Sequence, residues 1–261
     1  MMEEVNDLGS LKPRYTPGAQ VEPKGVVGWK LETPPGPAGH YRLAQVDDYG
    51  RLQRQAYPWS PPLRISLRGR VSARDIPGTW GFGLWNNPFG IAVWSGVERI
   101  RLPALPQAAW YFFASEASYL ALKDDLPAHG QVASVFRSVS PPAGILALGL
   151  PLLPLLAVPV VARLLRRLAR TIVQQEAVEL AVDPTAWHKY EMQWREHGVT
   201  FWVDGEVTLE SGVSPVGPLA LVMWVDNQYM RLPSDGRIRL GTQGSEVKAW
   251  VEIDDLVVSE T

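Results

Sequence analysis

The sequence predicts an all-β protein, a jelly-roll sandwich that carries one inserted apolar and helical segment. Short runs of strand-forming residues recur along the chain between turns that draw on 23 glycines and 23 prolines, as in sandwiches and jelly rolls. The run Leu63–Ala73 alternates apolar and polar residues without a break, which indicates a half-buried strand. Because sandwiches of this length often form a single unit, we expect one domain over residues 1–261.

The segment before the first clear strand is rich in proline and glycine. We therefore expect residues 1–40 to form an irregular arm, with one strand near Val26–Leu31. Two strands follow on either side of an Asp-Tyr-Gly turn, at Tyr41–Val46 and Gln53–Tyr57. The alternating strand Leu63–Ala73 comes next and ends at a Pro-Gly pair.

Further strands are expected on both sides of the insertion. Before it they cover Thr79–Trp85, Ile91–Ser95, Trp110–Ala114 and Val132–Ser138. After it, an Asp-Gly pair between two strand patterns predicts a tight hairpin. The strands expected in this later part are Lys189–Trp194, Val199–Val203, Glu206–Glu210, Leu219–Val225, Ile238–Gly241 and Ala249–Val258.

The insertion covers about residues 141–180 and differs in kind from the rest. Ala143–Ala162 holds twenty residues without a charge, and Arg163–Glu179 has the pattern of an amphipathic helix that Pro159 could begin. We expect an apolar arm and a helix that together form a lid or a peripheral membrane contact. Residues assigned to this role are Leu150, Leu152, Leu153, Leu155, Leu156, Arg163, Arg166, Arg167 and Arg170.

Those four arginines occupy the first half of the predicted helix, where the helix dipole disfavours positive charge. Two interpretations are open. The arginines could form a solvated face, or they could meet the anionic headgroups of a membrane beside the apolar arm.

Composition excludes several classes of function. The chain has no cysteine, four histidines without metal-pair spacing, and a net charge of −2, so we expect no metal, no cofactor and no nucleic-acid partner. The acidic first residues lack the pattern of a secretory signal. We therefore expect a cytoplasmic protein, peripheral at the membrane if the arm binds lipid.

Four segments, in order, resemble the concanavalin A-like jelly roll of family-16 glycoside hydrolases, the laminarinases and lichenases. Trp187–Glu210 is similar to their W-H-x-Y-x-x-x-W strand followed by a V-D-G hairpin. Arg70–Asn87 resembles the strand that leads into a G-x-W-x-x-x-W segment. Leu219–Gln228 and Ala249–Val258 resemble two later strands. The resemblance covers about Leu63–Val258 without the insertion, and it implies an open concave face that binds polysaccharide.

The catalytic signature of that family is missing. The resemblance implies E-x-D-x-E or E-x-D-x-x-E on the strand that here would be Gln107–Tyr119, and this stretch holds one acid, Glu116. A retaining glycosidase needs two carboxyl groups close together. Glu116 and Asp226 are therefore weak catalytic candidates. We expect a non-catalytic or diverged protein, with a diverged family-16 hydrolase as the alternative.

Aromatic residues stand where the resemblance places the missing acids. We expect them to form a cleft that binds a carbohydrate or an apolar small molecule, although any one of them could instead belong to the sandwich core. Polar residues that follow two tryptophan-containing strands would edge the cleft, although such residues often only form turns. The expected ligand-binding residues are Trp85, Asn86, Asn87, Trp110, Phe112, Trp224, Asn227 and Tyr229.

Overall fold

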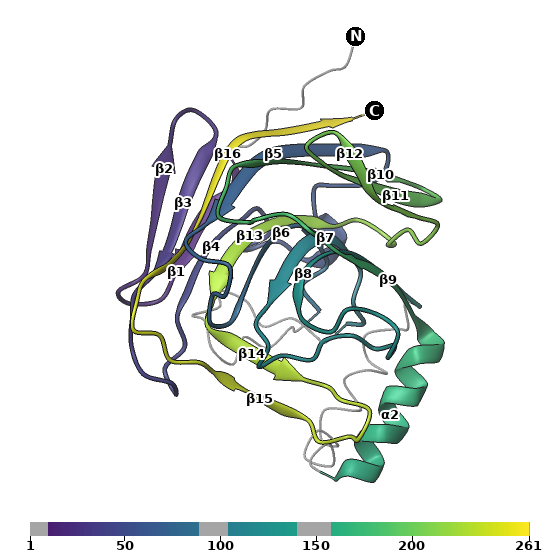
Figure 1. Ribbon diagram of the computed structural model, residues 1–261. Helices are drawn as coiled ribbons and strands as arrows, with labels where there is room; N and C mark the ends of the chain where they lie inside the picture. The colour runs from purple at the N-terminus through teal and green to yellow at the C-terminus, as the bar shows by residue number, and fades with distance from the viewer. Residues whose placement is uncertain (1–9, 89–103, 140–157, 261) are drawn as a thin grey trace.

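The protein is a sandwich of two antiparallel seven-stranded sheets, as the computed structural model shows for residues 10–88, 104–139 and 158–260 (Figure 1). The β6 sheet has, in spatial order, β1 (Lys12–Tyr15), β4 (Leu43–Asp47), β13 (Ala220–Asp226), β6 (Thr79–Trp85), β7 (Ala108–Ala114), β8 (Gly130–Ser138) and β9 (Val173–Glu179). The β5 sheet has β12 (Glu206–Ser211), β11 (Gly198–Val203), β10 (His188–Arg195), β5 (Leu63–Val71), β16 (Ala249–Glu260), β3 (Gly28–Thr33) and β2 (Gln20–Lys24). The prediction of an all-β jelly-roll sandwich is confirmed.

Two further elements lie beside the β6 sheet, on the side away from the β5 sheet (Figure 1). One is a hairpin of β14 (Gln228–Arg231) and β15 (Arg239–Thr242), and the other is the helix α2 (Pro159–Ile172), which begins with the predicted Pro159 and leads directly into β9. Within the described residues, no helix has both the length and the apolar character needed to span a membrane.

The core between the sheets consists of the inward side chains of alternating strands. In β6 these are Trp80, Phe82 and Leu84, and in β5 they include Leu63, Ile65 and Leu67. The ring of Phe82 meets the ring of Tyr190 from the opposite sheet edge-on, with centroids 5.0 Å apart. Burial of such apolar side chains is the main contribution to the stability of the sandwich.

One buried hydroxyl joins the two sheets. The Tyr111 hydroxyl, on β7, lies 2.7 Å from the carbonyl oxygen of Glu191 and 2.8 Å from that of Trp202, on β10 and β11. Burial raises the pKa of Tyr111 well above its usual value, so this hydroxyl stays protonated and donates. The contact fixes where the β6 sheet sits on the β5 sheet.

Several boundaries differ from the expectation. The helix predicted over Arg163–Glu179 ends at Ile172, and residues 173–179 pair with β8 as an edge strand. Gln53–Tyr57 forms a short 3-10 helix, Arg54–Ala56, instead of a strand. Residues 10–40 contain β1, β2 and β3, which belong to the two sheets, so this part is not an irregular arm. Ile91–Ser95 and the apolar arm, with Leu150, Leu152, Leu153, Leu155 and Leu156, lie outside the described residues.

Replacing Tyr111 by Phe removes the hydroxyl and leaves two buried carbonyl oxygens without this donor. We expect the free energy of unfolding to fall by about 1–3 kcal/mol, measured by chemical denaturation. Tyr15→Phe is the matched control, because Tyr15 is exposed. Equal stability of the two variants would contradict the role assigned to this hydroxyl.

Candidate functional site

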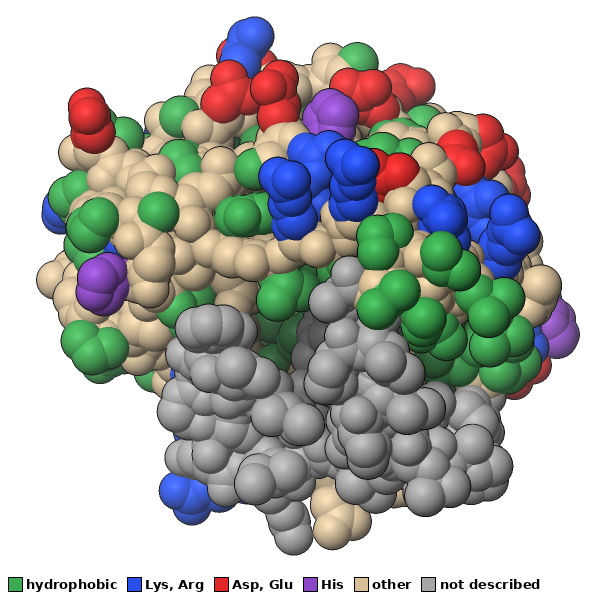
Figure 2. All heavy atoms as spheres, turned by 90° about the horizontal axis from the view of Figure 1, so that it is seen from below, with side chains coloured by type: hydrophobic (Ala, Val, Ile, Leu, Met, Phe, Trp, Pro, Cys, Tyr) green, Lys and Arg blue, Asp and Glu red, His purple; other side chains and the backbone are tan. Residues whose placement is uncertain are grey.

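The outer face of the β6 sheet, turned away from the β5 sheet, carries a second apolar cluster that is separate from the core. Its central members, which we call the aromatic patch, are Trp85, Trp110, Phe112 and Trp224. Leu43, Tyr49, Tyr57, Ala220, Val222 and Tyr41 surround them. Figure 2 looks onto this side of the molecule and shows hydrophobic side chains in a hollow near its centre.

The strand register explains why these rings share one face. Trp224 on β13 stands opposite Gly81 on β6, and Gly81 stands opposite Phe112 on β7. Gly83 stands in the same way between Val222 and Trp110. Residues directly opposite one another in adjacent strands point to the same side of the sheet. The alternation in β6 therefore sends Trp80 and Phe82 inward and the two glycines outward.

Glycine at positions 81 and 83 makes room for the rings. A Cβ atom on Gly81 would lie 2.7 Å from the Trp224 indole, and one on Gly83 would lie 2.6 Å from the Cβ of Trp110. Both distances are too short for carbon atoms, so any larger residue would push the rings off the sheet. The indoles instead lie over β6 and cover its backbone.

The rings of the patch contact one another closely. Trp85 and Trp224 stack with an angle of 10° between their planes and centroids 6.5 Å apart. Trp110 and Phe112 stack with centroids 5.4 Å apart, and the Trp110 ring is 5.7 Å from that of Trp224. Trp224 is 8 % exposed, whereas the other three are partly exposed. The patch is thus a contiguous aromatic surface made of two stacked pairs, Trp85 with Trp224 and Trp110 with Phe112, whose planes are tilted against each other, by 52° between Trp110 and Trp224. Aromatic surfaces of this kind can stack on planar or ring-shaped ligands.

Asp226 lies at one end of the same face and holds the patch in place. Its carboxylate accepts hydrogen bonds from the Thr79 hydroxyl (2.8 Å) and the Tyr41 hydroxyl (3.4 Å), and the Trp224 indole N–H donates to Thr79 (3.0 Å). Burial raises the pKa of Asp226 to about 7, against the lowering effect of these hydrogen bonds. Asp226 therefore orients Trp224 through Thr79.

Glu116, the other weak catalytic candidate, is not brought onto the patch. It lies exposed in the turn that follows β7. Asp226 is on β13, and β6 lies between β13 and β7, so two strand spacings, roughly 9–10 Å, separate β13 from the strand that Glu116 follows. No described hydrogen bond joins them. Retaining glycosidases hold their carboxyl groups about 5–5.5 Å apart.

The predicted polar residues of the cleft edge serve the backbone instead. The Asn86 side chain bonds the Leu105 carbonyl and the Gln107 N–H, at 2.8 and 3.1 Å. The Asn227 side chain accepts from the Arg42 N–H and donates to two carbonyl groups, between 2.7 and 3.0 Å. The carbonyl oxygen of Asn87 accepts from Arg54. The side-chain amides of Asn86 and Asn227 thus fix loops, with both their oxygen and their nitrogen in hydrogen bonds.

The predicted aromatic residues lie in two places, the patch and the strand β14. Trp85, Trp110, Phe112 and Trp224 come together in the patch as expected, whereas Tyr229 lies on β14, outside it. The sequence reasoning missed Tyr41, Tyr49 and Tyr57, which belong to the same cluster. Within the described residues, no group of histidine and acidic side chains is arranged to hold a metal ion.

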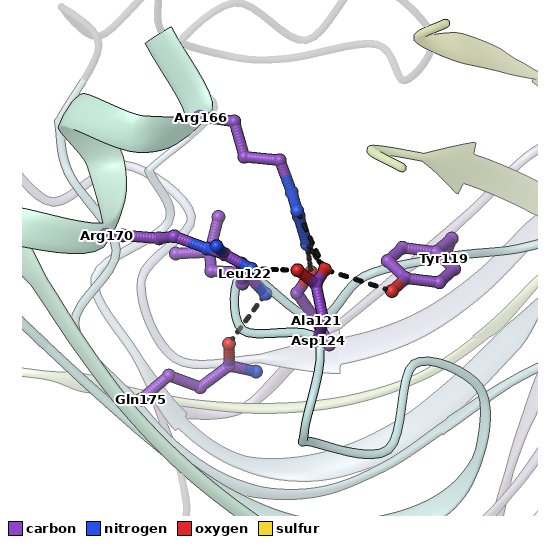
Figure 3. A network of polar contacts seen from close by, with 7 residues as sticks. All are labelled: Tyr119, Ala121, Leu122, Asp124, Arg166, Arg170 and Gln175. Atoms are coloured by element: carbon purple, nitrogen blue, oxygen red, sulfur yellow. Dashed lines mark hydrogen bonds and ion pairs between the residues drawn. The ribbon is translucent and has the colours of Figure 1, made fainter. Parts of the chain in front are cut away.

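The helix α2 turns Arg166 and Arg170 toward Asp124 (Figure 3), whereas Arg163 and Arg167 are exposed. Arg166 and Arg170 form ion pairs with Asp124, at 2.8 and 2.5 Å, and Arg166 is only 9 % exposed. Of the two interpretations left open for the arginines, the solvated face does not hold for Arg166, because Asp124 and the carbonyl of Ala121 bind its guanidinium. Leu164, Leu165 and Leu168 are exposed instead, at 65, 42 and 53 %.

Replacing Asp226 by Asn should flatten the dependence of stability on pH. The folded carboxyl has a pKa of about 7 and the ordinary value is 3.8, so between those values the unfolded chain releases a proton that the folded chain retains. Stability from this group is present below pH 4 and is lost as the pH rises to 7, by up to roughly 4 kcal/mol. Burial also raises the pKa of Asp48 to about 7, so part of the slope remains.

The measurement is the melting temperature of both proteins from pH 4 to pH 8. We expect the melting temperature of Asp226→Asn to exceed that of the wild type most clearly near pH 8. It should also fall less steeply than that of the wild type as the pH rises. The exposed Asp125→Asn is the control and should follow the wild type. An unchanged slope in Asp226→Asn would show that Asp226 is ionised in the folded protein.

Among known proteins, the chain is similar to solved structures in its overall architecture alone. No protein-family model and no curated protein sequence matches the chain. Similar solved structures include a β-1,3-glucanase from Mycobacterium marinum (TM-score 0.49, 11 % identity, 98 % of this chain and 93 % of that one) and a Bacillus licheniformis β-glucanase (0.48, 10 %, 100 % and 96 %). The catalytic domain of an endo-1,3-β-glucanase (laminarinase) from Thermotoga petrophila RKU-1 is a third (0.46, 12 %, 94 % and 81 %). Glucanases and laminarinases are the class that the sequence motifs resemble.

Proposed function

We propose that the chain binds a carbohydrate on the outer face of the β6 sheet, without hydrolysing it. The observation that carries the proposal is the aromatic patch itself: three tryptophans and a phenylalanine gathered on one face, over two glycines that leave room for them. A sugar ring has flat faces of C–H groups, which stack on aromatic rings, and an edge of hydroxyl groups, which need polar partners.

Polar groups beside the patch support a sugar over a purely apolar ligand. Gln45 lies on the same face beside Trp224. Its amide nitrogen already bonds Asp47 and Tyr49, so its amide oxygen is the atom that could accept from a sugar hydroxyl. The Ser134 hydroxyl lies beside Trp110, donates to the Glu176 carbonyl and could still accept. Ligand sites commonly combine an apolar floor with a few placed polar groups of this kind.

A diverged hydrolase is the alternative, and the positions of the acids argue against it. Asp226 is occupied in holding Thr79 and Trp224, and its hydrogen-bond partners do not include a carboxyl group. Hydrolysis with retention needs a nucleophile and an acid together. Hydrolysis of a glucan that is lost in Asp226→Asn or in Glu116→Gln would favour this alternative.

Titration with β-1,3-glucan and mixed-linkage glucan oligosaccharides tests the proposal, with binding followed by calorimetry and sugar release followed in parallel. We expect Trp110→Ala to weaken binding about tenfold, because one aromatic contact contributes up to about 1.5 kcal/mol. Trp202→Ala is the control, since Trp202 is a partly exposed tryptophan on β11 of the other sheet. Equal loss in both variants, or no binding by the wild type, would overturn the proposal.

A second candidate function is a peripheral membrane contact through α2. Its support is the row of exposed apolar side chains on this helix, Val160, Leu164, Leu165 and Leu168. Exposed apolar rows on a helix with positive charges are typical of interfacial helices. In this arrangement the leucines would enter the lipid.

Vesicle flotation tests the membrane contact. With vesicles of phosphatidylserine and phosphatidylcholine, we expect the wild type to float and the double variant Leu164→Gln, Leu168→Gln to stay behind, because it lacks two apolar anchors. Val207→Gln is the control, an exposed valine on β12. A wild type that ignores the vesicles would remove this candidate and leave the sugar site unaffected.

A further inference from the structure

The four arginines of α2 form one charged face. Arg163, Arg166, Arg167 and Arg170 follow the spacing i, i+3, i+4, i+7, which places them on a single side of a helix. Like charges at these spacings repel one another, and each such pair destabilises a helix by about 0.2–0.5 kcal/mol. The first helical turn also carries the positive end of the helix dipole. Such a face needs negative charge nearby.

The described residues supply only part of that charge. Asp124 pairs with Arg166 and Arg170, and carbonyl oxygens of Ala121 and Leu122 accept from the same two guanidinium groups (Figure 3). The carboxylate of Asp235 lies 4.0 Å from Arg237. Among the described residues, Asp124 is the one carboxylate paired with the four arginines, which leaves three of their positive charges unbalanced within this part of the chain.

The arginines surround a small recess. A pocket of about 160 Å³ lies between α2 and the β14–β15 loop, lined by Arg163, Arg166, Arg167, Arg170 and Ser234. Liquid water takes about 30 Å³ per molecule, so the pocket has room for a small polyatomic ion. Four of its five lining residues are guanidinium donors and the fifth is a hydroxyl.

Donors of this pocket remain unused. The Nε of Arg166 is buried and has no hydrogen-bond partner, although the side chain is more than nine-tenths buried. Arg167 makes no described hydrogen bond or ion pair, and Arg163 reaches only the Asp235 carbonyl at 3.3 Å. An unsatisfied buried donor on a charged group is costly. A ligand that accepts several hydrogen bonds would satisfy these groups.

We propose that this arginine pocket binds an oxyanionic group, a phosphate or a sulfate, either as the free ion or as an ester on a soluble ligand. The planar guanidinium fork matches the spacing of oxygen atoms in these groups and binds them with paired, charge-assisted hydrogen bonds. The Ser234 hydroxyl adds one more donor. The site is independent of the aromatic patch, and neither depends on the other.

The geometry of α2 favours a soluble ligand over a lipid headgroup. With roughly 3.6 residues per turn, Leu164, Leu165 and Leu168 lie on the side of the helix opposite the arginines. A membrane that accepted the leucines would therefore face away from the pocket. The pocket opens instead beside the β14–β15 loop.

Calorimetric titration with inorganic phosphate and with sulfate, at constant ionic strength set by chloride, tests this proposal. We expect saturable binding with one ion per chain. The double variant Arg163→Gln, Arg167→Gln should bind at least tenfold more weakly, because hydrogen bonds to charged groups contribute about 1.5–3 kcal/mol each. Both arginines are exposed at the helix surface, so circular dichroism and melting temperature should stay close to those of the wild type.

A control variant and a comparison of two ligands complete the experiment. Arg137→Gln removes an exposed arginine of β8 that does not line the pocket and should leave binding unchanged. Tighter binding of glucose 6-phosphate than of inorganic phosphate would support an ester as the ligand, and the reverse would support the free ion. Absent saturation, equal affinity in the double variant, or binding only to phosphatidylserine vesicles would overturn the proposal.

Discussion

The β6 sheet is apolar on both faces, and this constraint governs the rest of the structure. Every residue of β13 is buried. Leu221, Met223 and Val225 face the core, while Ala220, Val222 and Trp224 face outward. When both faces of a sheet are apolar, each face must pack against other parts of the protein or a ligand. The β5 sheet covers one face, and the aromatic side chains of the second cluster pack on the other. The candidate site is therefore built from residues that the sheet needs for its own burial.

Gly81 and Gly83 determine how side chains can pack on the outer face of the β6 sheet. In β6, the pattern of alternation gives the inward face three large residues and the outward face Gly81 and Gly83. A Cβ at either position would meet a backbone carbonyl oxygen at 2.5 Å, and also the Trp224 indole in the case of Gly81 or the Trp110 Cβ in the case of Gly83. The glycines thus let Trp224 and Trp110 approach β6 from the strands on its two sides. Glycine normally weakens a strand, and here the side chains of Trp110 and Trp224 compensate by packing against the two glycines.

Patterns that depend on neighbouring residues could be predicted, and those that depend on distant partners could not. The alternation of β5 and the apolar runs of β6, β7 and β13 located these strands to within one or two residues, and the same alternation placed Trp110 and Phe112 on one face. Asn227 was misjudged because its partners are far away in sequence: Arg42 is 185 residues distant. A turn residue looks the same in sequence whether its amide meets a ligand or a loop.

The end of α2 shows how tertiary pairing overrides local preference. Residues 163–179 read as one helix, yet from Val173 the chain pairs with β8 in register from Ser138 to Val132. The edge of the β6 sheet offers seven residues of backbone pairing, and the alternation of residues 173–179 suffices to accept it. Leu164, Leu165 and Leu168 of the preceding helix face solvent, and Asp124 pairs with Arg166 and Arg170 on the side of α2 that faces the protein. The pairing of β9 with the sheet edge thus sets where α2 ends, and the ion pairs with Asp124 set which side of the helix is turned to the protein.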